Sequence, residues 1–404
     1  MKPPSMKGSS VNRRVLAFAL PALLAAAAHA EFSPLSVHPE GFGMPVAPMG
    51  ARERALGEAG MASIPLGGGF YPSNPARTAF NDKTVFTATL ENDVDWLRDD
   101  ASSTRQTTGA FPSLATLVKT KTFGTFGAYY QQAFQRNFEA RMARSGDSAT
   151  TGYIAEGGLY TLGASWGYAI RPWLSVGVAE NLVLGRDRYI RSTDFTGTAP
   201  AEAEDLADTT LETSAVGSYP TISVMVRLPR NLDLALAYSH SASLDVERSR
   251  STTYQGSDPV ADTTADLPQT VSFGASWRPD KRQTAIFDVV YENWTDTRLL
   301  NPAWSVGAGY EFRASQSAFD GLLKRTAWRA GAGYKMLYLR EVPEVYATAG
   351  FGMPLGLRGH QLDFAVKYGH RSLESGTLFT EDYVKLSASV VGVSVWGQPA
   401  RRRR

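Results

Sequence analysis

Apolar side chains alternate with small or polar ones along many stretches of this chain, each nine to twelve residues long. In residues 232–239 the apolar positions are Leu232, Leu234, Leu236 and Tyr238, and residues 160–168 and 362–369 repeat the pattern. Successive side chains of a β-strand point to opposite faces, so each stretch has one apolar and one polar face. Many such strands in one chain are typical of a transmembrane β-barrel, with lipid outside and a polar lumen.

Alternation and turn residues together predict an all-β fold, an antiparallel transmembrane barrel of about fourteen strands. The predicted extents are 84–96, 109–120, 122–138, 156–169, 173–192, 215–229, 232–248, 267–278, 283–298, 302–313, 325–337, 342–354, 358–373 and 381–397.

The connections between these strands alternate in length. Short turns follow the even-numbered strands, as at 171–172 and 279–281, and longer segments follow the odd ones, as at 139–155, 193–214 and 249–266. Outer-membrane barrels show this asymmetry, because their periplasmic turns are short and their outer loops long. The 314–324 connection is an exception, being long where a tight turn is expected.

The first thirty residues have the three parts of a secretory leader. Lys2, Lys7, Arg13 and Arg14 are basic, residues 15–27 are apolar, and Ala28-His29-Ala30 is an A-x-A cleavage site. We therefore expect export by the Sec pathway, cleavage after Ala30 and a location in the bacterial outer membrane. No later stretch approaches the ~18 uninterrupted apolar residues of a transmembrane helix.

Composition and charge exclude some chemistry. The chain has no cysteine, so disulfides and thiolates cannot contribute. The full chain carries +2, and the leader holds four basic and no acidic residues, so the mature chain carries −2. This balance gives no indication of nucleic-acid binding. Residues 398–404 end in four arginines, which we interpret as a solvated periplasmic tail.

Residues 31–82 do not alternate and are rich in glycine, proline and alanine. A barrel of about fourteen strands leaves an aqueous pore unless something fills it. We therefore expect residues 31–82 to fold inward as a plug, ahead of a barrel over residues 83–397. Asn74-Pro75-Ala76 predicts a rigid turn, and Gly57 and Gly60 allow close packing against a barrel wall. An ordinary loop with an Asn-Pro turn is the alternative.

Parts of this chain resemble the FadL/TodX (OMPP1) family of outer-membrane transporters. Residues 50–62, Gly-Ala-Arg-Glu-Arg-Ala-Leu-Gly-Glu-Ala-Gly-Met-Ala, followed by Asn74-Pro75-Ala76, are similar to the family's N-terminal hatch signature. Residues 283–294 resemble a late strand of the family. The chain departs from the pattern between the glycines and Asn74, where residues 64–70 replace an acidic stretch, and at its end, which lacks a terminal phenylalanine.

The resemblance implies passive uptake of hydrophobic compounds such as long-chain fatty acids, with the N-terminal segment as a hatch. The partners it implies are outer-membrane lipids and a hydrophobic small molecule. The chain has no G-x-x-x-x-G-K-[ST] loop, which agrees with transport down a gradient. PorV-type barrels of type IX secretion carry similar glycines and Asn-Pro-Ala, so a barrel that binds or shuttles secreted proteins is the alternative.

A carboxylate headgroup would need a cation in the lumen. Arg227, Arg313, Arg329 and Lys367 fall at inward-facing positions and are the candidates. The alternative is that they pair in structural networks with acidic residues that also face inward. These acidic residues are Asp233, Asp288, Glu292, Glu311 and Asp363.

Two features do not fit a simple alternating barrel. Glu180 falls on the apolar face of residues 174–178, which predicts a bulge or a mis-assigned face. Gly124 and Gly127 lie in the third strand and indicate a kink or side opening; a simple bulge or a close contact is the more common reason for glycines in a strand.

Enzymatic chemistry finds little support in the sequence. Ser239 and Ser241 flank His240, but alternation sends them to the opposite face, and no nucleophile motif is present. No two histidines have metal-ligand spacing, and the acidic 193–214 segment lacks a calcium-loop pattern. We expect no catalytic residues, no metal and no cofactor; a lipid hydrolase using His240 is the remote alternative.

Overall fold

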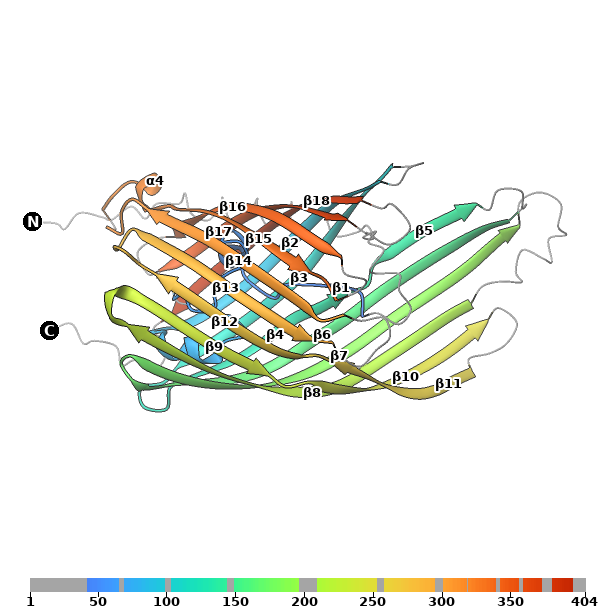
Figure 1. Ribbon diagram of the computed structural model, residues 1–404, viewed down its shortest axis with the longest axis horizontal. Coiled ribbons are helices and arrows are strands. Elements are labelled where there is room, and N and C mark those ends of the chain that lie inside the picture. Colours follow the sequence, from blue (N-terminus) through green and yellow to red (C-terminus); the bar gives the residue numbers. More distant parts are fainter. Residues whose placement is uncertain are drawn as a thin grey trace, which may run out of the picture.

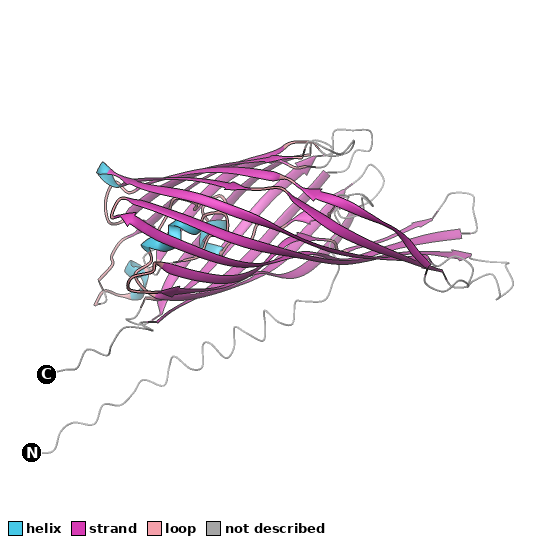
Figure 2. Cartoon of the chain, turned by 90° about the horizontal axis from the view of Figure 1, so that it is seen from below, coloured by secondary structure: helices cyan, strands magenta, loops and turns pink. Residues whose placement is uncertain are grey.

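The computed structural model describes most of the chain between Phe42 and Ser394. The described residues are 42–64, 69–98, 103–143, 149–195, 209–252, 258–294, 301–317, 319–338, 342–355, 359–372 and 380–394. The predicted leader and basic tail lie outside them. Together they form a closed antiparallel barrel with a short segment of chain inside it (Figures 1 and 2).

Fourteen strands build the barrel wall in the described part of the chain, which confirms the predicted strand number and antiparallel class. They are β2 (Thr84–Arg98), β3 (Ser103–Lys119), β4 (Thr125–Gln135), β6 (Ala149–Arg171), β7 (Leu174–Phe195), β8 (Thr209–Leu228), β9 (Leu232–Ser239), β12 (Gln269–Trp277), β13 (Gln283–Asn293), β14 (Ala303–Arg313), β15 (Ala327–Met336), β16 (Pro343–Leu355), β17 (His360–Ser372) and β18 (Thr380–Ser394).

The barrel closes where β18 pairs with β2, over a continuous register from Thr380↔Arg98 to Ser394↔Thr84. Short connections such as 120–124 and 229–231 lie at one end of the barrel, here named the turn end. The 314–326 connection lies at the same end and contains the single-turn helix α4 (Leu322–Arg325); η2 (Pro229–Asn231) is another turn there. The opposite end is named the loop end.

Four further strands lie outside this count. β1 (Met44–Pro45) belongs to the segment inside the barrel, and β5 (Phe138–Ala143), β10 (Ala242–Thr252) and β11 (Asp258–Leu267) continue the wall toward the loop end. β5, β10 and β11, together with β6, β7 and β8, make one side of the barrel taller than the other (Figure 1). This side is here named the tall side.

The predicted loop at 249–266 is therefore wrong, because β10 and β11 pair there as far as Arg250↔Asp258. Parts of the predicted 139–155 and 193–214 loops are also strand, and β7 pairs with β8 as far as Arg191↔Thr209. Beyond an apolar belt both faces of a strand meet water, so alternation is lost while the hydrogen-bond ladder continues.

Large apolar side chains cover the outside of the wall as a belt. On β7 the outward positions run from Leu174 to Leu184 and are followed by the exposed Arg186. Ten residues of a strand tilted by about 40° span roughly 25 Å along the barrel axis, the usual height of a lipid-facing band. Exposed rings lie toward its edges, among them Trp173 and Trp277. Trp294 also lies at a strand end, directly after β13, but is buried inside the barrel.

Glu180 lies on the outside of this belt, midway along it. Its neighbours in register are Ala164 on β6 and Pro220 on β8, and the β7 ladder runs through this point without a shift. The adjacent outward side chains Val178 and Leu182 are exposed apolar groups. Both explanations from sequence, a bulge or a mis-assigned face, are therefore wrong. The Glu180 side chain makes no ion pair or hydrogen bond within the described residues.

We expect Glu180→Leu to stabilise the barrel in a bilayer by about 1–2 kcal/mol, since acidic groups at the middle of a lipid face are unfavourable. Unfolding by guanidinium in phosphatidylcholine vesicles measures this. Glu156→Leu, at an exposed position closer to the loop end, is the matched control and should change stability little. Equal effects of the two substitutions would contradict a mid-belt position for Glu180.

Residues 42–82 form the inner segment, of which 42–64 and 69–82 are described. Its helical turns, α3 (Ala51–Arg54) and η1 (Pro75–Phe80), lie within the barrel (Figure 2). It begins with β1, which pairs with the last residues of β4, toward the loop end. From there it runs to the start of β2 at the turn end. No helix in the described part of the chain is long and apolar enough to cross a membrane.

Candidate functional site

The Asn74-Pro75-Ala76 triplet begins η1 and connects the two halves of the inner segment. Asn74 Oδ1 accepts a hydrogen bond from the Arg77 backbone N–H at 3.3 Å, and Asn74 Nδ2 donates to the Met61 carbonyl at 2.8 Å. Pro75 takes the first helical position, where a missing N–H costs nothing. Asn74 thus caps η1 and also joins it to the loop around Met61.

The helical turn η1 rests on glycines of the wall. A Cβ added to Gly177 would lie 2.2 Å from the Ala76 nitrogen, and one added to Gly167 would lie 2.4 Å from Thr78 Oγ1. The Ala76 N–H donates to Ser223 Oγ at 2.8 Å. Backbone meets backbone here because the wall has no side chain in the way.

Gly57 and Gly60 make a second contact of this kind. Gly57 has φ +69° and meets the wall so closely that a Cβ would lie 2.3 Å from the Ala308 carbonyl oxygen. The Gly60 and Met61 N–H groups both donate to Asp288 Oδ2, at 2.7 and 2.8 Å. Asp288 therefore holds the backbone of the inner segment.

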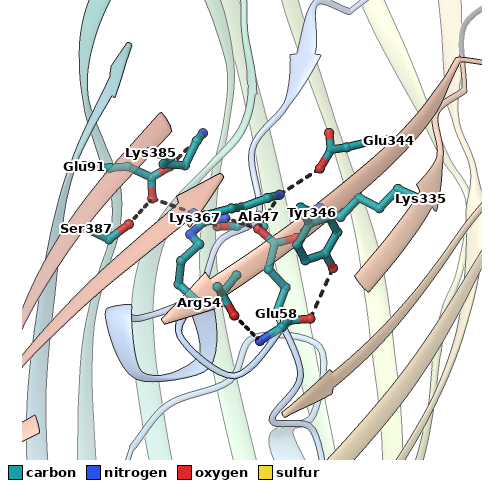
Figure 3. Close-up of polar contacts among 12 residues, drawn as sticks. Ala47, Arg54, Glu58, Glu91, Lys335, Glu344, Tyr346, Lys367, Lys385 and Ser387 are labelled. Carbon is teal, nitrogen blue, oxygen red and sulfur yellow. Dashed lines mark hydrogen bonds and ion pairs between the residues drawn. The ribbon is translucent and has the colours of Figure 1, made fainter. Parts of the chain in front are cut away.

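Arg54 forms the centre of a buried ionic network (Figure 3). Its guanidinium donates to Glu58, to Glu91 on β2 at 2.5 Å and to the Ala47 carbonyl at 3.2 Å. Lys385 on β18 also pairs with Glu91, at 2.8 Å. Removing one member of a buried pair leaves the other charge without water or partner, so such a network holds its elements together strongly.

Glu58 extends the network along the wall to β15, β16 and β17, on the same side of the barrel as β18 and β2. It pairs with Lys335 on β15 and with Lys367 on β17 at 3.0 Å, and Lys367 pairs in turn with Glu344 at 2.8 Å (Figure 3). Burial alone would raise the pKa of Glu58, but Lys335, Lys367 and Arg54 outweigh it and hold the pKa well below its usual range. Its stabilising effect is thus present at neutral pH and lost only in strong acid.

A second network lies nearer the turn end. Arg329 donates to Glu311 at 2.7 Å and to Asp363 at 2.5 Å, and Arg52 of the inner segment reaches the same Glu311 at 3.1 Å. Glu53 accepts from Arg77 at 3.0 Å. These pairs connect α3 with the wall and with η1.

The four cations predicted from sequence all have neighbours in the barrel. Arg329 and Lys367 are buried in the two networks described above. Arg313 donates to Gln361 at 3.4 Å, and the Arg227 guanidinium lies 3.8 Å from the centre of the Phe80 ring. Arg329 and Lys367 thus lie in ion pairs, Arg227 lies against the inner segment, and Arg313 contacts Gln361 of the wall.

Four aromatic rings pack together on the loop side of these networks, here named the ring cluster: Phe42, Phe134, Trp294 and Tyr338. Trp294 and Tyr338 are stacked with centroids 4.6 Å apart, and Phe42 lies 5.8 Å from Trp294. The Tyr338 hydroxyl donates to the Gly43 carbonyl at 2.6 Å. Apolar residues of the tall side of the wall extend the cluster, namely Leu159, Val183, Leu244, Val246 and Leu267. Met44 of the inner segment and Leu337 and Val342 between β15 and β16 also belong to it.

A cavity of about 350 Å³, here named the outer cavity, adjoins the ring cluster on the tall side. Its apolar lining includes Phe42, Leu159 and Val246. Its charged lining residues are Arg136, Asp187 and Arg248, of which Arg136 and Asp187 pair at 2.5 Å. Arg248 has no ion pair within the described residues, and its Nε has no hydrogen-bond partner there.

Sequence reasoning missed Arg248, although it ends an alternating run with Leu244 and Val246. All three face inward, opposite Thr213 and Ala215 of β8. Extending the alternation by one inward position would have found it. The absence of an ion pair at Arg248 depends on which strands pack beside it on the tall side, and no pattern in the neighbouring sequence indicates it.

A second cavity, the inner cavity, has a volume of about 180 Å³. It lies between the inner segment and strands β13 to β16, and Tyr338 of the ring cluster lines it. Phe42 of the same cluster lines the outer cavity. The ring cluster therefore separates the two cavities.

The wall is interrupted beside the ring cluster. β3 pairs with β4 only between Ser113↔Gln131 and Lys119↔Thr125, and β1 pairs with the rest of β4, at Phe134 and Gln135. The interruption is not at the glycines indicated by sequence. Gly127 pairs regularly, and a Cβ there would meet Ser165 Oγ at 2.4 Å, so its role is a close contact.

Comparison with known proteins places the chain in a family. Residues 12–398 match the model of the BamG family. The chain belongs to the BamG family. No curated protein matches it.

Several solved barrels share the fold of this BamG-family chain. The toluene transporter TbuX of Ralstonia pickettii is 13% identical over 85% of this chain and 98% of its own, with a TM-score of 0.61. A FadL homologue of Pseudomonas aeruginosa is 12% identical over 86% and 99%, with a TM-score of 0.63. The toluene transporter TodX of Pseudomonas putida is 14% identical over 86% and 98%, with a TM-score of 0.59. The barrel thus has the FadL/TodX fold.

We expect Gly177→Val to detach η1 from the wall, because the new side chain would occupy the position of the Ala76 nitrogen. Hydrogen exchange of the amides of residues 74–80 should accelerate at least tenfold. Gly321→Val is the control, since a Cβ there meets nothing within 4 Å. Unchanged exchange in Gly177→Val would show that η1 is held by other contacts.

Arg54→Met should loosen α3, because Glu58 and Glu91 lose a buried partner. The expected cost to local stability is about 3–5 kcal/mol, the usual effect of breaking a buried pair. Hydrogen exchange of residues 51–60 measures it, with Arg186→Met, at an exposed position on β7, as the control. Equal exchange in both variants would argue against a stabilising network.

Proposed function

We propose that this chain is an outer-membrane channel for the passive uptake of hydrophobic compounds. The observation that carries the proposal is the apolar interior of the loop side, where the outer cavity joins the ring cluster. The aliphatic and aromatic side chains there provide an apolar environment inside a barrel that also has an apolar outer belt. Alkyl and aryl groups gain about 0.8 kcal/mol per CH₂ on entering it.

The two cavities suggest the order of events. A compound enters the outer cavity, passes the ring cluster and reaches the inner cavity. Beyond this point the inner segment occupies the lumen, with α3 and η1 bound to the wall. Release toward the periplasm requires this segment to move as a hatch, and the ionic networks around Arg54 and Arg52 set the energy of that movement.

The substrate class is supported by the comparisons. TbuX and TodX are described as toluene transporters, which suggests small aromatic hydrocarbons. Long-chain fatty acids are the second class, implied by the FadL resemblance. For these, Arg248 is a better headgroup contact than the four cations predicted from sequence, because it lines an apolar cavity without an acidic partner in the described residues.

Uptake of labelled toluene and oleate by cells with and without the protein tests the proposal. A variant lacking residues 31–80 tests the hatch, and we expect its uptake to differ from that of the full chain. Arg248→Gln should lower oleate uptake about tenfold and leave toluene uptake unchanged. Arg188→Gln, at an exposed position on β7, is the matched control.

Surface expression of each variant is confirmed first by labelling intact cells. No uptake of either compound by cells with confirmed barrels would reject the channel. The alternative of a PorV-type barrel that binds secreted proteins predicts that result together with a stable protein complex on purification.

A further inference from the structure

The inner cavity has a charge that transport of hydrocarbons does not explain. Its lining contains three carboxylates, from Glu58, Asp288 and Glu292, and one ammonium, from Lys335. Glu58 is balanced, because it pairs with Lys335, Lys367 and Arg54. The charge of the cavity therefore depends on Asp288 and Glu292.

Asp288 and Glu292 have hydrogen bonds but no ion pairs in the described part of the chain. Asp288 Oδ2 accepts from the backbone of residues 60–61 and from the Tyr71 hydroxyl, and its Oδ1 is buried without a partner there. Glu292 accepts from Trp294 Nε1 at 2.9 Å. Two inward positions of β13 thus carry carboxylates that hydrogen bonds satisfy in part and that form no ion pair within the described residues.

Aromatic rings line the same cavity, from Tyr71, Tyr338 and Tyr346. The Tyr346 ring already receives ammonium groups of the protein, since Lys367 Nζ lies 3.9 Å and Lys335 Nζ 5.5 Å from its centroid. Rings combined with carboxylates are the usual surroundings of alkylammonium ligands, which have an apolar surface and a positive charge.

We propose that the inner cavity is a binding site for a small organic cation, a protonated amine or quaternary ammonium compound. The inference rests on the proposed function, in which this cavity lies on the transport path. Its volume of about 180 Å³ is sufficient for such a group, since an apolar cavity of about 150 Å³ holds benzene. A carboxylate would meet Asp288 and Glu292, so the inner and outer cavities prefer opposite charges.

Lys335 is the group that opposes this assignment, because its ammonium faces the cavity. Its ammonium pairs with Glu58 and lies 5.5 Å from the centroid of the Tyr346 ring. Glu292 is the best residue to test. Glutamine at this position keeps an oxygen to accept the Trp294 hydrogen bond and removes only the charge.

Calorimetric titration of the detergent-purified full chain with choline and with its uncharged isostere 3,3-dimethylbutan-1-ol tests the proposal. We expect choline to bind at least tenfold more tightly than the alcohol. Glu292→Gln should weaken choline binding about tenfold and leave the alcohol unchanged. Glu156→Gln, at an exposed position on β6, should bind like the wild type.

Equal binding of choline and the alcohol by the wild-type chain would overturn the proposal without any variant. So would unchanged choline affinity in Glu292→Gln, once its near-ultraviolet circular dichroism matches that of the wild type. Toluene uptake separates this inference from the proposed function: uptake without choline selectivity rejects only the cation site, and absence of both rejects the channel as well.

Discussion

Closure of β18 on β2 is the constraint on which the rest of this structure depends. A membrane-spanning strand cannot leave its backbone N–H and C=O groups unpaired in hydrocarbon, so the sheet has to return to its first strand. Fourteen strands enclose more space than their own inward side chains can fill. The lumen therefore needs further contents, and the inner segment and the ring cluster supply them.

The contents of the lumen are divided by polarity along the barrel. Toward the turn end, Arg54 and Arg52 bind the inner segment to carboxylates of the wall, and wall glycines such as Gly177 let its backbone approach closely. Toward the loop end, aliphatic and aromatic groups pack beside the outer cavity. This division lets one barrel combine a strongly held segment with a region that solvates hydrocarbons.

Several parts of this arrangement could be predicted from sequence because their signals are local. Alternation located the strands around residues 232–239 and 362–369, and Asn74-Pro75-Ala76 indicated an ordered turn. Glu180 shows the limit of the method: alternation places it correctly on the apolar face, but a carboxylate there favours a bulge or a mis-assigned face, and neither is present. The ladders at 249–252 and 258–266 were missed because both strand faces meet water.

The sequence by itself determined the barrel class, the number of strands and which face of each strand points inward, because these follow from a two-residue period in single strands. Only the tertiary structure decided which inward residues meet. Lys367 pairs with Glu58, 309 positions away in the chain, whereas Arg248, Asp288 and Glu292 form no ion pair within the described residues. The reason is physical: period 2 sets the direction of a side chain, but the register of fourteen strands and the path of the inner segment set its neighbours.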